Sequence, residues 1–413
     1  MNRREFLKSA LAFATLAPVV SFADGEGAPA ADAAGVGAGK IDRRRYKDTD
    51  LSLPLLGFGM MRLPRAGGKG EIDYATAERM VARAFEAGVN YFDTAYMYHN
   101  GLSEKFVGDA LSKYPRESFF LADKLPVGRI KSEEDVDRIF NEQLAKCKTP
   151  YFDFYLLHAI NDGSWGKIES LHMVEYLEAR RKEGKIRKLG FSFHGSPNGL
   201  RTLADKHPWD FVQIQLNCLD WTLQHAKEQY EILTSRGIPV IVMEPLRGGA
   251  LASLNPAAQA ILKAADEKAS PSSWAFRFVA SLPNVLVILS GMSRPEHLEE
   301  NIGTFTNTKA FSEADRLVLE RALIAYGKSG TVPCTGCRYC MPCPAGVDIP
   351  GNFLMHNRLK VSGDVERFKV EVGRLDKGAA AAACVKCGAC LKKCPQQIAI
   401  PDELAKIAKE QQG

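Results

Sequence analysis

The chain has 413 residues, of which 46% are hydrophobic and 25% are charged, as is ordinary for a soluble globular protein. This length accommodates one large barrel and a small module. The formal net charge is +5, and no dense stripe of Lys and Arg alternates with aromatic residues, which argues against nucleic acid as a partner. Eight of the ten cysteines lie beyond residue 330, which indicates a cysteine-rich module at that end.

Residues 1–23 are predicted to be an export signal. The segment 2–8, NRREFLK, resembles a twin-arginine signal peptide, and an apolar stretch over 10–20 follows it. This stretch is too short for a permanent membrane span, and Ser21-Phe22-Ala23 offers a cleavage site after Ala23. The alternative is a chance pair of arginines. We expect the twin-arginine (Tat) translocon as a partner during export, and a periplasmic or otherwise exported location.

Repeated strand and helix patterns predict the main fold. Residues 24–44, which begin with a run of Ala, Gly and Pro, are expected to form a flexible linker, and a hairpin is expected over 46–56. Amphipathic helical segments, for example at 75–86, 133–146, 171–185, 226–236 and 274–282, then alternate with apolar runs of strand length. The eight runs lie at 55–60, 90–94, 119–125, 154–158, 188–193, 211–217, 240–245 and 285–290.

Eight strand–helix alternations over roughly 250 residues fit a (β/α)8 TIM barrel in both count and size. A doubly wound sheet is the structural alternative. It would normally carry a G-x-G-x-x-G turn after its first strand, and no such turn occurs there. The chain is therefore predicted to be an α/β protein with a barrel over 45–305 and a connecting helix within 306–330, at about 313–326.

Residues 331–413 are predicted to form a ferredoxin-type domain, because two cysteine runs match the ligand spacing of two [4Fe–4S] clusters. In two-cluster ferredoxins the fourth cysteine of each run ligates the other cluster, so Cys394 should join the first run and Cys343 the second. The alternatives are disulfides in an exported protein and zinc, which normally uses two C-x2-C pairs. The expected ligands are Cys334, Cys337, Cys340, Cys343, Cys384, Cys387, Cys390 and Cys394.

The long insert between the two runs, with a predicted helix on either side of residues 352–355, resembles the helical type of two-cluster ferredoxin domain. The first run has two residues before its last cysteine where three are usual, and this departure concerns the placement of Cys343. Clusters are compatible with the signal peptide, since the resemblance to twin-arginine signals implies export in the folded state.

Four polar residues follow the predicted strands in the pattern of a catalytic site. Asp93 with Tyr98, Lys124 and His158 lie at the ends of three successive strands, which a barrel brings onto one rim. A carbonyl that accepts hydride needs a proton donor at its oxygen, and Tyr98 can supply it. An ammonium beside a phenol lowers its pKa from about 10, so Lys124, paired with Asp93, is expected to lower that of Tyr98.

His158 is expected to be neutral and to orient the carbonyl oxygen. The alternative for His158 is a core histidine, and the alternative for Asp93 and Tyr98 is a turn cap and a packing residue. The four occur together at strand ends, which favours a site.

The barrel resembles the aldo/keto reductase superfamily, and the whole chain resembles the iron–sulfur aldo/keto reductases. The resemblance rests on residues 56–62, 93–98 with 103–104, Lys124, 153–158, 184–190, 245–249 and 291–301. It implies the catalytic roles above and NADP or NAD as cofactor, with NADP preferred. Phe193, Met243 and His297 depart from the usual pattern. The implied cofactor-binding residues are Gly59, Met60, Ser192, Gln213, Pro245, Leu246, Gly248, Gly291, Ser293, Arg294, Glu300 and Asn301.

The sequence therefore predicts an exported oxidoreductase that carries out NAD(P)H-linked carbonyl reduction or alcohol oxidation, coupled to electron transfer through two [4Fe–4S] clusters. Its partners would be a small carbonyl or alcohol substrate and a redox partner protein. The alternative is an electron-transfer subunit whose barrel binds a nucleotide or a partner without carbonyl turnover. Because NADPH is scarce outside the cytoplasm, a dinucleotide bound before export is expected to be retained by the loops 245–249 and 291–301.

Overall fold

The computed structural model describes residues 40–412 except 48 and 69–70, so the predicted signal and most of the predicted linker lie outside the described residues. The strands are β1 Arg43–Arg45, β2 Ser52–Pro54, β3 Leu56–Gly59, β4 Tyr91–Asp93, β5 Phe120–Leu125, β6 Phe152–Ile160, β7 Ile186–Phe193, β8 Phe211–Gln215, β9 Val240–Met243 and β10 Val285–Ser290.

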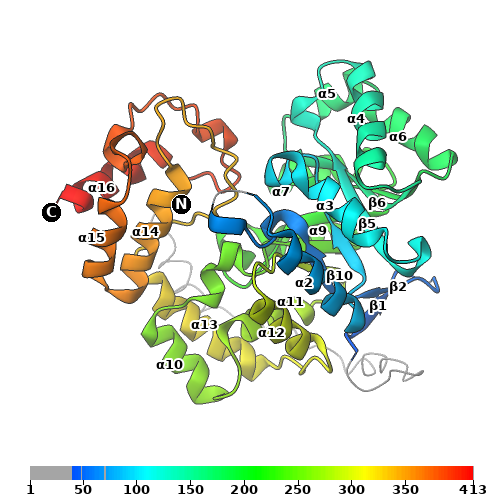
Figure 1. The fold of residues 1–413 in the computed structure, drawn as a ribbon. Coiled ribbons are helices and arrows are strands. Elements are labelled where there is room, and N and C mark those ends of the chain that lie inside the picture. The colour runs from blue at the N-terminus through cyan, green and yellow to red at the C-terminus, as the bar shows by residue number, and fades with distance from the viewer. Residues whose placement is uncertain (1–39, 48, 69–70, 413) are drawn as a thin grey trace. The chain divides into compact units, whose positions relative to one another are not determined.

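The chain is mainly helical between and after these strands (Figure 1). The α-helices are α2 Tyr74–Glu86, α3 Leu102–Leu111, α4 Glu133–Lys146, α5 Trp165–Ser170, α6 Met173–Lys182, α7 Pro197–Ala204, α8 Asp220–Leu223, α9 Ala226–Ser235, α10 Pro256–Ala265, α11 Pro271–Ala280, α12 Pro295–Phe305, α13 Glu313–Gly327, α14 Ile349–Ser362, α15 Val365–Gly373 and α16 Ile400–Gln412. The 3-10 helices are η1 Met60–Arg62, η2 Ala66–Gly68, η3 Tyr98–Gly101, η4 Arg116–Ser118, η5 Val127–Arg129, η6 Arg247–Ala252, η7 Lys377–Ala379, η8 Ala381–Ala383 and η9 Leu391–Lys393.

The strands β3 to β10 form a closed parallel barrel in which each strand pairs with the next one along the chain. Pairing of β10 with β3, through Ile288 with Leu56 and Ser290 with Phe58, closes the ring. The predicted (β/α)8 barrel is confirmed. Strands such as β10 are buried along their whole length, because the barrel interior covers one face and the outer helices cover the other.

An antiparallel hairpin of β1 and β2 covers the N-terminal end of the barrel. Tyr46 and Leu53 pack against the interior residues Tyr91 and Phe154, and the Tyr46 hydroxyl donates to the Asp210 carbonyl just before β8 at 3.0 Å. The C-terminal ends of the strands lie at the opposite end of the barrel, where side chains can form a site.

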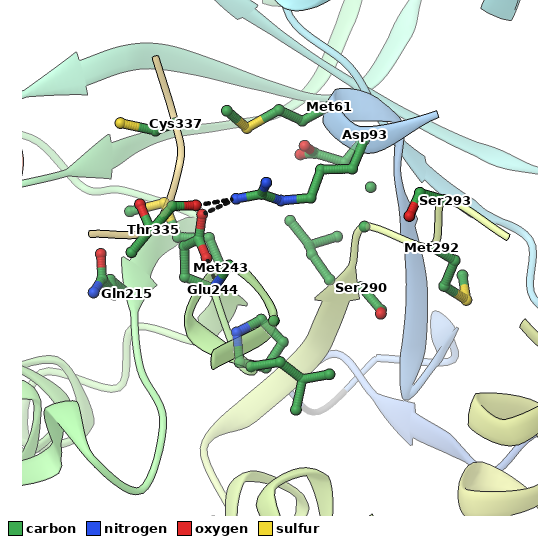
Figure 2. Close-up of a pocket in the computed structure, with 18 of the residues that line it drawn as sticks. Met61, Asp93, Gln215, Met243, Glu244, Ser290, Met292, Ser293, Thr335 and Cys337 are labelled. Carbon is green, nitrogen blue, oxygen red and sulfur yellow. Dashed lines mark hydrogen bonds and ion pairs between the residues drawn. The ribbon is translucent and has the colours of Figure 1, made fainter. Parts of the chain in front are cut away.

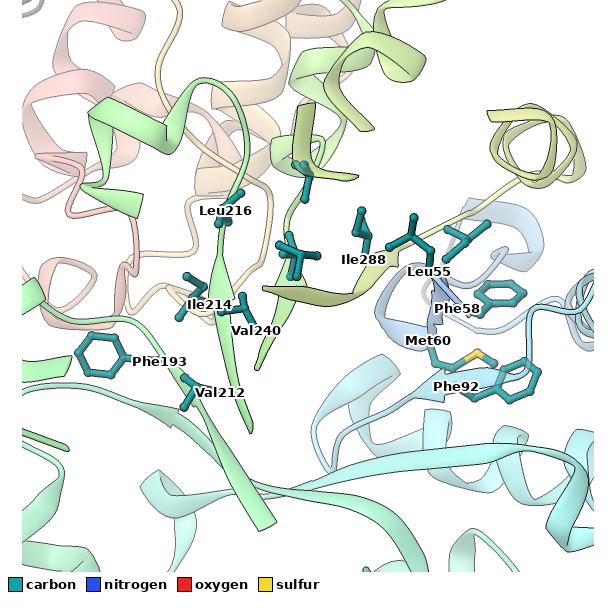
Figure 3. Packing of buried hydrophobic residues seen from close by; sticks show 14 of the residues in the cluster. Leu55, Phe58, Met60, Phe92, Phe193, Val212, Ile214, Leu216, Val240 and Ile288 are labelled. Atoms are coloured by element: carbon teal, nitrogen blue, oxygen red, sulfur yellow. The ribbon is translucent and has the colours of Figure 1, made fainter. Parts of the chain in front are cut away.

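The layer between the strands and the outer helices forms the main hydrophobic core, part of which Figure 3 shows. Met60 is fully buried in this layer and lies beside Phe92 (Figure 3). Several outer helices begin with an N-cap and a proline at the next position, as in Ser196-Pro197 and Ser270-Pro271. Such residues satisfy free amide groups and preset the first turn.

The region after the barrel is helical, as predicted. Helix α13 contacts the barrel's α10 region, where the Asn255 amide donates to the Ala325 carbonyl at 3.0 Å. Residues beyond 331 have a hydrophobic cluster of their own, which includes Val347, Phe353 and Leu404 and is packed against cysteines of both runs. Within the part of the chain that the structure describes, no helix is long and apolar enough to cross a membrane.

Candidate active site and cluster sites

The four predicted catalytic residues come together at the C-terminal ends of the adjacent strands β4, β5 and β6. The Lys124 ammonium donates to Asp93 Oδ1 at 2.5 Å and to the Thr94 carbonyl at 2.6 Å. Its nitrogen lies 5.1 Å from the centre of the Tyr98 ring, and the Tyr98 and His158 rings are perpendicular with centroids 5.9 Å apart. The fully buried Lys124 is therefore paired and hydrogen-bonded, as a buried charge requires.

The protonation of Tyr98 differs from the sequence-based prediction. Burial raises the pKa of Tyr98 well above 10, and the carboxylates of Asp93 and Glu244 raise it further. The pKa of Tyr98 is therefore raised rather than lowered as predicted, because burial and these carboxylates outweigh the Lys124 ammonium, which is directed to Asp93 and the Thr94 carbonyl. Tyr98 is thus a neutral phenol at physiological pH and can act as a proton donor.

His158 is neutral, as predicted, since burial lowers its pKa well below 6.5 and the Lys124 charge lowers it further. A register shift between Leu157 and Ile160 interrupts the pairing of β6 with β7 next to this residue. Ala159 has a φ of 55°, and its amide donates to the Ser192 hydroxyl at 2.8 Å. This irregularity, which is common beside active sites, sets the position from which His158 enters the site.

These four residues (the tetrad) lie beside a cavity of about 300 Å³. Asp93, Tyr98 and His158 help to line this cavity. Figure 2 shows part of it, including Asp93 from β4 together with Thr335 and Cys337 from beyond the barrel. Ten of the twelve predicted cofactor-binding residues line this cavity: Gly59, Ser192, Gln213, Pro245, Leu246, Gly248, Gly291, Ser293, Glu300 and Asn301.

The other two predicted cofactor-binding residues lie elsewhere. The Met60 side chain belongs to the core, where its apolar surface is fully buried. The Arg294 guanidinium is exposed and pairs with Glu296 at 3.0 Å. The structure therefore gives neither side chain a place in the cavity lining.

The lining fits a nicotinamide dinucleotide. The Gln213 Oε1 atom is buried in the lining without a hydrogen-bond partner, and it can accept an N–H from a carboxamide. The Ser192 hydroxyl, which accepts from Ala159, keeps its own proton to donate. Ser293 and Asn301, which also line the cavity, offer polar groups for phosphate oxygens.

An arginine–glutamate pair that sequence reasoning missed joins the barrel rim to the first cysteine run. Arg62 donates to Glu244 Oε1 at 3.1 Å and to the Thr335 carbonyl at 2.6 Å, and Figure 2 marks both contacts with dashed lines. Glu244 has a φ of 55°, a strained conformation for a residue with a side chain. Arg62 stood within a motif that resembled the family, but nothing in the sequence identified its partners.

A second missed group is a buried polar network that includes Gln396. The Gln215 amide donates to Gln396 Oε1 at 3.0 Å and Gln396 donates back at 2.7 Å. Arg247 also donates to Gln396 at 3.1 Å and binds Asp220 at 3.0 Å. Asn217 completes the network by donating to Asp220 at 2.6 Å. This network fixes the segment after Cys394 to the strand ends.

The eight cysteines of the two runs line two small cavities. One cavity is lined by Cys334, Cys337, Cys340 and Cys394. The other is lined by Cys343, Cys384, Cys387 and Cys390, with Cys340 at their common border. Each fourth cysteine thus faces the other run's cavity, in the crossed arrangement predicted for two [4Fe–4S] clusters, and Cys343 takes part despite its shorter spacing.

The cysteine geometry also bears on zinc and disulfides. All ten cysteines are free thiols. Among the described residues, no group of three or more His, Cys, Asp or Glu side chains lies close enough to hold a single metal ion. Four thiols spread around a cavity suit a four-iron cube rather than one zinc ion.

Comparisons with known proteins agree with this site. Residues 55–318 match the aldo/keto reductase family, and residues 333–399 match the 4Fe-4S dicluster domain. L-galactose dehydrogenase from Arabidopsis thaliana is 29% identical over 66% of this chain and 90% of its own length. The NADH-specific methylglyoxal reductase of Escherichia coli is 24% identical over 66% of this chain and 95% of its own length.

Among solved structures, the holo form of an aldo-keto reductase from Bacillus halodurans is similar, with a TM-score of 0.57 and 24% identity. The match covers 68% of this chain and 96% of that one, and it shows the shared barrel fold. The family match covers more than half of the chain. This protein therefore belongs to the aldo/keto reductase family and carries a C-terminal 4Fe-4S dicluster domain.

Proposed function

We propose that this oxidoreductase reduces a small aldehyde or ketone with NAD(P)H, or catalyses the reverse oxidation, with Tyr98 as the general acid or base. The observation that carries the proposal is that Tyr98, His158 and the unpartnered Gln213 oxygen line one cavity. The named activities of two relatives, on L-galactose and on methylglyoxal, support a small carbonyl or alcohol substrate.

The side chains have distinct roles in this proposal. A bound dihydronicotinamide supplies hydride to the carbonyl carbon. The Tyr98 phenol donates its proton to the carbonyl oxygen, so that an alcohol forms, and neutral His158 orients that oxygen. Lys124, held by Asp93, stabilises the phenolate that remains until a proton returns from solvent.

The identity of the dinucleotide rests on the phosphate end of the cavity. Arg294 was expected to bind phosphate oxygens, and its guanidinium pairs with Glu296 at the surface. His297 and Ser293 do line the cavity. We therefore propose NAD(P) binding through the loop 291–301 without a preference for the 2′-phosphate.

We further propose that electrons move between solvent and the barrel cavity through both clusters. Cys387 is the exposed cysteine of the second cavity. Cys340 borders both thiol cavities, and Cys337 lines the first thiol cavity as well as the barrel cavity. This order supports the proposal of a path from a redox partner near Cys387 to the cavity that holds Tyr98.

We also propose that the protein is exported and that it keeps its dinucleotide bound. Both start from the twin-arginine resemblance at residues 2–8, which lies outside the described residues. Gly248 lies directly against the Thr335 backbone, because a Cβ at Gly248 would approach the Thr335 oxygen to 2.2 Å. The ferredoxin-type domain thus covers the loop 245–249, which supports a dinucleotide that is bound before export and exchanges slowly.

A carbonyl screen with anaerobically purified protein tests the proposed chemistry. Wild type should reduce small aldehydes with NADH or NADPH, and Tyr98→Phe should lower kcat by about 10²–10⁴-fold because it removes the proton donor. Tyr114→Phe, at a half-buried tyrosine outside the cavity, is the matched control. If Tyr98→Phe reduces carbonyls at the wild-type rate, the assigned role fails. Cluster reduction with no carbonyl turnover by wild type would favour the electron-transfer subunit.

A further inference from the structure

Tyr339 lies between two cysteines of the first run, yet its side chain belongs to the barrel's cavity. Its hydroxyl is 3.4 Å from His158 Nε2, and it lines the cavity with Tyr98. The two residues in contact are 181 positions apart in the chain. A side chain of the ferredoxin-type domain therefore stands beside the group that is proposed to orient the substrate oxygen.

The loop of the first cysteine run, residues 334–340, does not require a tyrosine at position 339. Comparison with the loop of the second run, residues 384–390, shows this. Gly336 and Arg338 of the first run have φ values of 68° and 64°, and Lys386 and Gly388 of the second run have φ values of 53° and 74°. The two loops thus share a backbone course. The residue equivalent to Tyr339 is Ala389, so a methyl group is sufficient to form such a loop.

The Tyr339 loop is anchored to the barrel on both sides. Arg62 donates to the Thr335 carbonyl at 2.6 Å, and Gln396, two positions after Cys394, exchanges hydrogen bonds with Gln215. Two residues of the cavity lining, Arg62 and Gln215, therefore hold the loop in place. A ring held in this way acts as a fixed wall rather than as a freely moving side chain.

We propose that Tyr339 is a substrate-positioning residue that covers His158 and restricts the carbonyl pocket to small aldehydes and ketones. This inference rests on the proposed carbonyl chemistry for its consequence, but the covering of His158 is a separate, measurable property. It implies that the active site is built by both domains, because the barrel alone would leave this side of the tetrad open.

Burial is consistent with this role. It lowers the pKa of His158 well below 6.5, so this imidazole is neutral. A neutral phenol can donate to a neutral imidazole. The contact is therefore a hydrogen bond between uncharged groups, which a substrate oxygen can replace at modest cost.

The first readout is chemical modification of His158 in the iron-loaded protein by diethyl pyrocarbonate, followed by peptide mass spectrometry. Tyr339→Ala should increase the rate of His158 modification by on the order of tenfold, equivalent to a loss of about 1.4 kcal/mol of protection. Tyr339→Phe keeps the ring and should behave as wild type. His194 lines the same cavity and should react at an unchanged rate, so it is an internal reference.

The second readout is the ratio of kcat/KM for 3-phenylpropanal to kcat/KM for propanal. Tyr339→Ala should raise this ratio by about 10–200-fold, the range that small changes in pocket size produce, and Tyr339→Phe should not. Val385→Ala, at a 70% exposed position of the second loop, is the matched control. All variants should keep wild-type iron content.

Each outcome bears on the inference. Unchanged His158 protection and an unchanged ratio in Tyr339→Ala would overturn it. Iron loss in Tyr339→Ala would also overturn it, since Tyr339 would then serve the cluster. If wild type reduces no carbonyl while Tyr339→Ala exposes His158, the covering role stands and the proposed carbonyl chemistry fails.

Discussion

The side-chain amides of Gln215 and Gln396 exchange two hydrogen bonds, of 3.0 and 2.7 Å, across the boundary between the barrel and the ferredoxin-type domain. Both residues are buried. Gln215 ends β8, and Gln396 follows the cysteine that crosses from the second run to the first cavity. The position of a cluster ligand is therefore tied to the same rim that carries the catalytic residues.

Replacing Gln396 by Leu should loosen this junction. The substitution removes the Gln396 oxygen that accepts from Gln215 and Arg247 and the Gln396 amide that donates to Gln215, which costs about 1–3 kcal/mol. We expect faster hydrogen exchange in residues 395–400 and in the Thr335 loop, measured by mass spectrometry on the iron-loaded protein. Gln411→Leu is the matched control, because Gln411 bonds only within its own domain, to Asn352 at 2.9 Å. Equal exchange in both variants would contradict the anchoring role.

The pH dependence of carbonyl reduction should show a broad plateau. The acid must be protonated, and burial raises the pKa of Tyr98 above 10, so activity should be lost only as pH rises past that value. His158 must be neutral, and its pKa lies below 6.5, so activity should be lost only as pH falls below it. A falling limb of kcat/KM between about pH 7 and 9 would show instead that Lys124 lowers the pKa of Tyr98.

The crossed arrangement of cysteines predicts which cluster each substitution damages. Wild type should contain about eight irons per chain, as two four-iron cubes require. Cys394→Ser should disturb the cluster of Cys334, Cys337 and Cys340, and Cys343→Ser the cluster of the second run. Electron paramagnetic resonance of the reduced variants distinguishes the two losses. Cys218→Ser, outside both cavities, should retain full iron. A wild-type content near four irons, or stoichiometric zinc, would refute the two-cluster assignment.

Local periodicity was sufficient to predict much of the fold. The predicted segments 133–146 and 285–290 have the bounds of α4 and β10, because their apolar pattern alone determines which face is buried. The predicted strand 211–217 ends earlier, at Gln215. The reason is that Asn217 accepts from the Leu219 and Asp220 amides at 3.1 and 2.8 Å and begins a turn.

The site was only partly predictable from the sequence. The tetrad could be found because strand ends in a barrel meet on one rim. Tyr339 and Gln396 could not be found, because their partners in the barrel lie more than a hundred residues earlier in the chain. These contacts depend on how the second domain packs against the barrel. The protonation of Tyr98 was also missed, because it depends on how deeply folding buries the phenol and on the carboxylates that folding brings beside it.

The retained-cofactor proposal predicts bound nucleotide in the exported protein. Mature protein purified from the exported fraction and then denatured should release about one dinucleotide per chain, since one cavity accepts one ligand. A variant with Arg3 and Arg4 both changed to Lys should stay in the cytoplasm. Protein that emerges empty and exchanges cofactor rapidly would contradict retention, as would wild type that stays in the cytoplasm.

The most direct test of electron transfer from the clusters to the Tyr98 site supplies electrons only through the clusters. Anaerobic exported holoprotein, with no added nucleotide, is given reduced methyl viologen and propanal, and the alcohol formed is counted against the viologen oxidised. Wild type should form one propanol for every two viologen oxidised, because aldehyde reduction takes two electrons and two protons, and Tyr98→Phe should form almost none. Viologen oxidation without propanol, or equal propanol from Tyr98→Phe, would contradict this electron transfer.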